Sequence, residues 1–325
     1  MPAQLMCRCF KTVICGHRNR QLVSRFDELE RLIGRDVGRN ISQLVQAVQG
    51  QLESAARSIS EHPKPKIAIV TGFFVPTITP PAAETDGPIG TAILTAVFER
   101  SGIPVELVTD EKCRSMLQVA RDVMQCSAPM VTVSGKEDVE TLKTRYLAGA
   151  AEVSHVLSIE RPGPAASGRV RNFKGRDLTD VTAPLHKLFE PLAGDRAYAT
   201  IAIGDGGNEI GMGRIDPGVV AGNIANGAEI ACVTPCDHLI VSGVSNWGGF
   251  ALAAGIASLV PRMRECVLEV MTPANCNALL EAIVDRGPAV DAIVGAQQYT
   301  IDGLPAEVHD QVLEGILNWL EDTTS

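Results

Sequence analysis

Short apolar runs alternate along this chain with stretches of helical periodicity, and no other feature constrains the fold as strongly. Six runs are typical of buried strands: residues 67–70, 105–108, 130–133, 155–159, 199–203 and 238–241. Apolar residues spaced three and four apart predict helices at 89–100, 112–125, 139–150, 180–190, 246–260, 274–286 and 306–321. This alternation predicts an α/β fold: a mostly parallel sheet with helices on both faces, in a Rossmann-like three-layer arrangement.

The first 62 residues lack the strand pattern. Helical periodicity at 24–33 and 41–59 stops at Pro63-Lys64-Pro65, because proline disfavours a helical residue before it. We therefore expect a helical amino-terminal lead-in, residues 1–62, packed against an α/β domain of residues 63–325.

Composition argues against several classes of protein. The net charge is −9 and no basic stripe stands out, so we expect no nucleic-acid partner. The longest apolar stretch, residues 250–260, is shorter than the roughly 20 residues that span a bilayer, so we expect no membrane partner. Nine scattered cysteines favour a reducing compartment: the cytoplasm or, given four basic and no acidic residues among the first 20, the mitochondrial matrix. A homo-oligomer is left open.

Two groups of cysteines lie close together in the sequence, and thiols can bind metal. The cysteines at positions 7, 9 and 15 and the histidine at 17 lack the spacing of the common zinc fingers, so we expect no zinc site there. Cys232 and Cys236 flank a Thr-Pro turn without C-x-x-C spacing, and we expect them to be small buried apolar groups.

Ligands bind such sheets beyond the carboxyl ends of the strands, so the loops after the strands are the candidate sites. After the first strand, Thr85 and Asp86 precede a helix. They either cap it or bind a ligand at its amino terminus, and the length of the loop favours a ligand. After the fourth strand, Glu160 and Arg161 indicate a clamp for a carboxylate or phosphate, with Lys174 in reserve.

The loop Gly204-Asp205-Gly206-Gly207-Asn208-Glu209 follows the fifth strand and is the strongest candidate. Asp205 and Glu209 supply carboxylates and Asn208 an amide, while the glycines let the backbone approach a ligand. The pattern is not a dinucleotide fingerprint, a P-loop or an EF-hand loop. It suits general acid–base chemistry, or a Mg²⁺ or Mn²⁺ ion bound by Asp205 and Glu209.

A serine-rich loop, residues 242–249, follows the sixth strand. It nearly spells the G-x-S-x-G elbow of serine hydrolases, but Trp247 replaces the second glycine and no matching histidine stands out, so we expect no triad. Ser245 and Asn246 either cap the next helix or form, with the backbone, a cradle for an anion. Near the end of the chain, Asp302 is expected only to form a turn.

Four motifs, in this order, resemble the carboxy-terminal domain of the D-glutamate cyclase family: Glu84-Thr85-Asp86-Gly87-Pro88, Ile159-Glu160-Arg161-Pro162-Gly163, Gly204-Asp205-Gly206-Gly207-Asn208-Glu209-Ile210-Gly211-Met212-Gly213 and Val244-Ser245-Asn246-Trp247-Gly248. The resemblance covers about residues 65–305. It implies a lyase that converts D-glutamate to 5-oxo-D-proline with loss of water. It also implies an additional amino-terminal domain in the mammalian members, which residues 1–62 cannot replace.

The chemistry of lactam formation assigns roles to the candidate residues. The substrate is a small amino-acid-like anion, and ring closure within one molecule draws much of its rate from proximity. Its α-carboxylate is expected to bind Arg161. Asp205 or Glu209 is the expected base for the ammonium group, and Glu160, Asp86 or a bound cation is expected to act at the γ-carboxyl. Four further residues complete the expected binding set: Thr85, Asn208, Ser245 and Asn246.

Two alternatives stay open. A metal-dependent hydrolase or transferase would hold its metal at the acidic loop and a phosphorylated metabolite at Ser245. A binding module would hold an amino acid without catalysis. Formation of 5-oxoproline from D-glutamate separates these readings.

Overall fold

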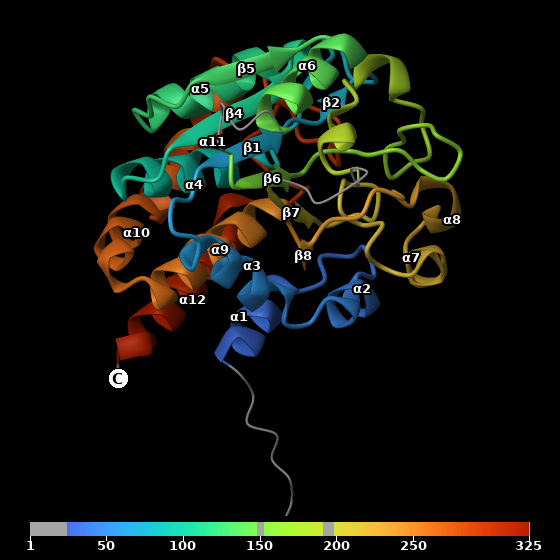
Figure 1. The fold of residues 1–325 in the computed structure, drawn as a ribbon. Coiled ribbons are helices and arrows are strands. Elements are labelled where there is room, and N and C mark those ends of the chain that lie inside the picture. The colour runs from blue at the N-terminus through green and yellow to red at the C-terminus, as the bar shows by residue number, and fades with distance from the viewer. Residues whose placement is uncertain (1–24, 148–152, 191–197, 325) are drawn as a thin grey trace, which may run out of the picture.

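The computed structural model describes residues 25–147, 153–190 and 198–324. Its centre is a parallel six-stranded sheet in the order β5-β4-β1-β6-β7-β8 (Figure 1). The strands are β1 Ile67–Thr71, β4 Val105–Asp110, β5 Met130–Val133, β6 His155–Ile159, β7 Ala199–Gly204 and β8 His238–Val241. All six lie where the apolar runs predicted them, and the predicted α/β class is confirmed.

The strands are apolar on both sides because helices cover both faces of the sheet (Figure 1). In β1, Ile67 and Ile69 enter one hydrophobic cluster, whereas Ala68 and Val70 enter the other. The first cluster draws on α1 Arg25–Ile33, α3 Gln51–Ser60, α4 Pro88–Arg100, α5 Arg114–Val123, α9 Ser245–Leu259, α10 Arg264–Val270, α11 Pro273–Asp285 and α12 Ala306–Glu321. The second draws on α2 Ser42–Ala47, α6 Lys136–Leu147, α7 Pro217–Asn223 and α8 Gly227–Ile230.

Helix α9 is the central helix of the first layer. It is buried on all sides from Ser245 to Ala257, as its uniformly apolar sequence requires. Glycine lets it cross α4 closely, since a Cβ added at Gly249 would lie 3.3 Å from the Cα of Gly90. This crossing brings the amino-terminal ends of α4 and α9 together at the carboxyl edge of the sheet.

The amino-terminal helices share the main core. Phe26, Leu29 and Leu52 are buried in the same cluster as α9. The single helix predicted at 41–59 is wrong: it is broken into α2 and α3 at Gly50, whose φ of 82° lies outside the helical region. The residues between α1 and α2 then run along the carboxyl edge of the sheet, where the amide of Gly243 donates to the carbonyl of Ile33.

Another predicted helix is wrong. Residues 180–190 form two short 3₁₀ turns, Thr179–Val181 and Leu185–Leu188, in place of an α-helix. Pro184 lies between the turns; it has no amide donor and disfavours helical geometry in the residue before it. Short helices α7, α8 and α10 were not predicted. Among the described residues, no single helix is long and apolar enough to cross a membrane, although α10 with its preceding turn and α11 meet the length and composition together as a bent pair.

The order of the strands creates a crevice at the middle of the sheet. From β1 the chain proceeds to β4 and β5 on one side, then returns to β6, β7 and β8 on the other. The loops after β1 and β6 therefore diverge, and such points bind ligands in open α/β sheets. The long loop after β1 carries a small hairpin, β2 Phe74–Val75 paired with β3 Ala82–Ala83, which forms one wall of the crevice.

Candidate active site

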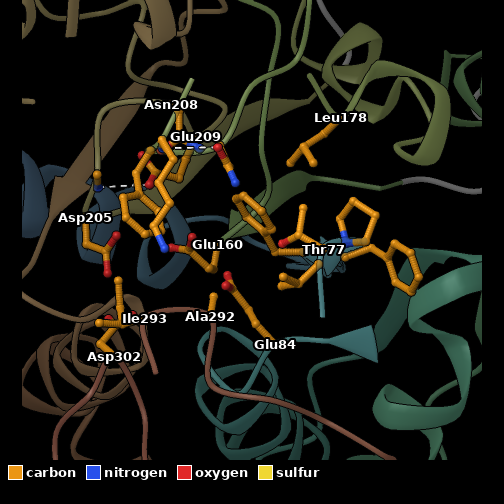
Figure 2. A pocket seen from close by; sticks show the side chains of 18 of the residues that line it. Thr77, Glu84, Glu160, Leu178, Asp205, Asn208, Glu209, Ala292, Ile293 and Asp302 are labelled. Atoms are coloured by element: carbon orange, nitrogen blue, oxygen red, sulfur yellow. Dashed lines mark hydrogen bonds between the residues drawn. The ribbon is translucent and has the colours of Figure 1, made fainter. Parts of the chain in front are cut away.

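A pocket opens at this crevice, and its walls come from segments far apart in the sequence (Figure 2). Acidic residues dominate its polar lining, and aromatic and aliphatic side chains from the hairpin and from a late loop face them. The lining consists of Arg39, Phe73–Thr77, Glu84, Glu160, Asn172–Lys174, Leu178, Asp205, Gly206, Asn208, Glu209, Ala292, Ile293 and Asp302.

The acidic side chains are crowded and shielded from water. Glu84, Glu160, Asp205 and Glu209 are 7%, 5%, 2% and 1% exposed, and the side chain of Asp302 is 7% exposed. Figure 2 shows Glu84, Glu160 and Asp205 with their carboxyl groups directed into the same space. Negative charges this close together and this well shielded from water are unfavourable, unless the carboxyl groups are protonated or paired with a cation.

Arg39 supplies a cation for this cluster and was not among the predicted site residues. Its guanidinium forms an ion pair with Asp205 and a second one, at 2.6 Å, with Asp302. Arg39 lies between α1 and α2, in the segment expected to be only a lead-in. One arginine in a polar turn matches no motif, so the sequence carries no signal for its role.

Asp302 also enters the site, although it was expected only to form a turn. It does so with a left-handed φ of 56°, which aspartate tolerates better than most residues. The buried carboxylate of Asp291 holds the loop in place by accepting the amides of Ile293, Val294 and Gly303 at 2.9, 3.0 and 2.7 Å. The turn was therefore correctly expected, and its position beside Arg39 was not.

Burial raises the pKa of these carboxyl groups, and Arg39 opposes the rise. The pKa values of Glu84 and Glu160 lie well above the ordinary range because burial removes water and neighbouring carboxylates repel. Burial also raises the pKa of Asp205, where Arg39 favours the ionised form. Burial raises the pKa of Asp302 to about 7 against the same attraction. Burial thus favours the neutral form of the acids around Glu160, and Arg39 favours the ionised form of the acids beside it.

Asp86 and Asn246 form a reciprocal pair of helix caps beside the pocket. The Asp86 carboxylate accepts the amides of Ser245 and Asn246 at 2.8 and 2.9 Å, at the start of α9. The Asn246 Oδ1 accepts the amides of Gly87 and Gly90 at 3.1 and 2.7 Å, at the start of α4. The predicted anion cradle at Ser245 and Asn246 is therefore wrong, because Asp86 already occupies its amides. Asp86 and Asn246 do cap helices, but each caps the start of the other's helix and not, as the alternative had it, the helix that follows it in the sequence.

Thr85 and Ser245 serve the site indirectly. The Ser245 hydroxyl donates to Glu160 Oε2 at 2.6 Å, so it orients an acid that lines the pocket. The Thr85 hydroxyl donates to the carbonyl of Thr300 at 2.9 Å and ties the loop after β1 to the segment that carries Asp302. Neither side chain belongs to the lining itself.

The acidic loop after β7 is shaped by its own glutamate. Both carboxylate oxygens of Glu209 accept amides, from Gly206 and Gly207, at 2.8 Å each. The Asn208 Nδ2 donates to the carbonyl of Arg171 at 2.9 Å and joins the loop to the opposite wall. Glu209 and Asn208 both line the pocket, yet their hydrogen bonds hold the loop together. Asp205 is the carboxylate that the loop presents to Arg39.

Arg161 lies elsewhere than expected. It is 1% exposed, pairs with Asp110 at 2.7 Å and donates to the carbonyls of Gly72 and Ala183 at 2.6 and 2.8 Å. Its guanidinium therefore joins segments inside the protein and does not line the pocket. Lys174 does line it, with an exposed side chain whose Nζ lies 5.0 Å from the centre of the Phe173 ring.

Carboxyl oxygens in two sets among the described residues are close enough to share one cation: Asp86, Asp205 and Asp302, and Glu160, Asp205 and Glu209. The second set contains both predicted metal ligands. A metal ion there would take the place of Arg39 at Asp205 and would compete with the amides at Glu209. The residues can hold a hard cation, at the expense of existing bonds.

The cysteines give no second metal site among the described residues. The cysteines at 7, 9 and 15 and the histidine at 17 lie outside the described ranges. Cys232 and Cys236 are buried, as expected. Burial raises the pKa of both thiols to about 12, so they are neutral thiols at physiological pH.

Comparisons with known proteins agree with the resemblance seen in the four motifs. The family model described as "D-glutamate cyclase-like, C-terminal" matches residues 29–317, which include Arg39 and every other residue that lines the pocket. The human protein "D-glutamate cyclase, mitochondrial" is 32% identical over 240 residues, or 70% of this chain and 38% of the human protein. The chain thus spans less than two fifths of that relative, whose name places it in the mitochondrion, the alternative compartment suggested by the basic amino terminus. This chain belongs to the D-glutamate cyclase-like, C-terminal family.

Proposed function

We propose that this chain is an enzyme that converts D-glutamate to 5-oxo-D-proline and water. The observation that carries the proposal is the crowding of carboxyl groups around one guanidinium: burial favours the neutral forms of Glu84 and Glu160, whereas the ion pair with Arg39 favours the carboxylate form of Asp205. Lactam formation needs an acid and a base close together, and paired carboxyl groups with separated pKa values supply both. The family membership and the name of the human relative support this choice of reaction.

In the reaction a bond forms between the amine nitrogen and the γ-carbon of the substrate carboxyl, and a carbon–oxygen bond breaks. Two protons leave the ammonium nitrogen, and two reach the oxygen that departs as water. Asp205 is the base in this scheme. Its carboxylate attracts the ammonium group electrostatically and then accepts a proton from it. Arg39 keeps Asp205 ionised until that transfer.

Glu84 and Glu160 act at the opposite end of the substrate. A neutral carboxylic acid can donate a hydrogen bond to the γ-carboxyl and then a proton to the departing oxygen. The two side chains are in hydrogen-bonding contact, so a proton lost by Glu160 can be replaced from Glu84. The Ser245 hydroxyl fixes the direction of Glu160 from behind.

The remaining substrate groups have partners in the pocket walls. Lys174 is the exposed cation that faces the α-carboxylate in this scheme. Phe73, Val75 and Ile293 lie against the methylene groups and limit the water in the pocket. Exclusion of water strengthens the electrostatic interactions of the carboxyl groups.

The proposal is tested by incubating the purified full chain with D-glutamate and measuring 5-oxoproline by mass spectrometry. We expect turnover in the wild type and a loss of at least about 100-fold in kcat for Asp205→Asn and Glu160→Gln, which each remove a proton-transfer group. Asp122→Asn, which changes an exposed carboxylate outside the pocket, is the control and should match the wild type. Saturable binding of D-glutamate without formation of 5-oxoproline would contradict the proposed enzyme and indicate a binding module.

The same assay decides between protons and a metal ion. Because Glu209 accepts two amides and Asp205 pairs with Arg39, we propose that proton transfer alone suffices. Chelator-treated, desalted protein should then keep its activity. If chelation abolishes the activity and Mg²⁺ or Mn²⁺ restores it, the group that acts at the γ-carboxyl is a cation bound by Glu160, Asp205 and Glu209.

A further inference from the structure

We infer that Asp36, an exposed carboxylate outside the pocket, is a positioning residue for the site: it holds the turn of residues 36–40 that delivers Arg39 between Asp205 and Asp302. The part of the test that measures enzymatic activity rests on the proposed function. No motif in the sequence marks this turn, and it lies before the region that carries the family motifs.

The turn is built around the Asp36 side chain. Its Oδ1 accepts three successive amides, those of Gly38, Arg39 and Asn40, at 2.9, 2.9 and 3.0 Å. Arg39 stands between two residues with left-handed backbones, since φ is 105° at Gly38 and 64° at Asn40. Aspartate is suited to such a turn because its short side chain reaches the amides that follow it. Among the described residues, no other side chain accepts hydrogen bonds from these three amides.

The bonds of Asp36 serve this turn and not a helix. Helix α2 begins at Ser42, and its capping position, Ile41, has no side-chain capping hydrogen bond. The amides that Asp36 accepts belong to residues 38–40, before the helix. The flanks of the turn have their own anchors: the carbonyl of Ile33 accepts the amide of Gly243 at 2.7 Å, and the Asn40 Nδ2 donates to the carbonyl of Asn223 at 2.9 Å. Asp36 therefore controls the part of the connection that carries Arg39.

The position of Arg39 matters because its guanidinium contacts two carboxylates at once. A guanidinium is a planar fork, and a small displacement breaks one of two simultaneous contacts. Within the described residues, Arg39 is the cation that forms ion pairs with Asp205 and Asp302. It lowers the pKa of both against the effect of burial. A loosened turn would thus destabilise the ionised form of the proposed base although the substituted residue, Asp36, lies outside the pocket lining.

The inference is tested with Asp36→Ala and Asp36→Asn, beside Arg39→Ala and the double variant Asp36→Ala/Arg39→Ala. We expect Asp36→Ala to lower kcat/KM about tenfold, since small misplacement of a catalytic contact costs this much or more. Asp36→Asn keeps an oxygen that accepts the amides and should stay within about twofold of the wild type. Asp138→Ala is the matched control: it removes an exposed carboxylate that accepts the amide of Ser134 at 2.7 Å and is not part of the pocket lining, and it should leave kcat/KM unchanged.

The double variant distinguishes positioning from general damage to the fold. If Asp36 acts through Arg39, Asp36→Ala should cost nothing further once Arg39 is alanine. The inference is overturned if the losses of kcat/KM from Asp36→Ala and Arg39→Ala multiply in the double variant. It is also overturned if Asp36→Asn is as impaired as Asp36→Ala, or if Asp36→Ala is as active as the wild type.

A readout that needs no turnover keeps the test separate from the proposed function. In ¹⁵N-labelled protein, the Arg39 side-chain signals, identified by their loss in Arg39→Ala, should show slow rotation of the guanidinium in the wild type and in Asp36→Asn, and fast rotation in Asp36→Ala. If the wild type makes no 5-oxoproline, the proposed function fails and these signals still decide the role of Asp36. Unchanged rotation in Asp36→Ala would overturn it.

Discussion

Asp205 and Asp302 contact the same guanidinium, yet they stand in different surroundings. Asp205 lies at the end of β7 in a loop of glycines, whereas Asp302 lies in a tight turn near the buried Asp291, which raises its pKa further. The pKa of Asp302 is raised to about 7, so this group titrates in the physiological range. At the scale of single residues, the site depends on which carboxyl group holds a proton, and burial and Arg39 act in opposite directions on that balance.

The raised pKa of Asp302 predicts a pH dependence of stability. Because the folded protein binds this proton more tightly than the unfolded chain, whose pKa is near 3.8, the stabilising contribution is present at low pH and is lost as the pH rises through about 7. Between pH 5 and 8 the wild type should therefore lose unfolding free energy relative to Asp302→Asn, by on the order of a few kcal/mol. Urea denaturation of both proteins across this range measures it. Curves that stay parallel would contradict the assignment.

At the scale of elements, the amino-terminal ends of helices α4 and α9 are joined to each other at the site. The amides at the start of α9 are bound by Asp86 from the residue pair before α4, and the amides at the start of α4 are bound by Asn246 from α9. Helix starts leave amides without backbone partners, and burial makes an unpaired amide costly. The exchange of caps therefore locks α4 to α9 directly behind Glu160, whose carboxyl receives the Ser245 hydroxyl.

This reciprocal cap predicts an unusual cost for one asparagine. Asn246→Ala leaves the buried amide of Gly90 without its acceptor and the amide of Gly87 with Asp86 alone, and it should lower the free energy of unfolding by about 2–3 kcal/mol. Thr272→Ala is the matched control, because it removes an ordinary cap of α11, where the side chain accepts the amide of Asn275 at 3.2 Å. That change should cost about 1 kcal/mol. Equal costs in denaturant titrations would show that the cap of α4 is not special.

At the scale of the whole molecule, the amino-terminal helices are part of the α/β body. Helices α1 and α3 contribute Phe26, Leu29 and Leu52 to the cluster that surrounds α9. The connection between α1 and α2 delivers Arg39 to the pocket. The family match likewise begins at residue 29, within α1. Core and site both therefore extend into the segment that the sequence marks as a separate lead-in.

Removing that segment is expected to destroy the fold as well as the site. Residues 63–325 expressed alone would expose the apolar face of α9 and leave the carboxyl cluster without Arg39. We expect this fragment to lack the cooperative unfolding transition of the full chain, because losing several large buried side chains removes several kcal/mol from a marginal total. Circular dichroism during thermal unfolding compares the two. A fragment with a sharp transition near that of the full chain would show that residues 25–62 are dispensable.

Local sequence patterns predicted the sheet and several of the residues that line the pocket. Six apolar runs indicated the parallel sheet, since a strand buried on both faces needs continuous hydrophobicity whatever its neighbours are. Glu160, Lys174, Asp205, Asn208 and Glu209 line the pocket because each follows a strand or faces such a loop. The predicted helices are interrupted at Gly50 and Pro184, because apolar periodicity alone does not register the backbone preferences of glycine and proline.

Only the tertiary structure decided which charges meet. Arg39 and Asp302 are 263 positions apart and have no local pattern, yet packing of α1 and α12 on α9 brings their loops to one pocket. The order of the strands places Arg161, after β6, within reach of Asp110 at the end of β4. The crossing of α4 and α9 makes Asp86 and Asn246 helix caps. Periodicity reports which side of an element is buried. It does not report the partner of a single charge, which depends on how distant elements cross.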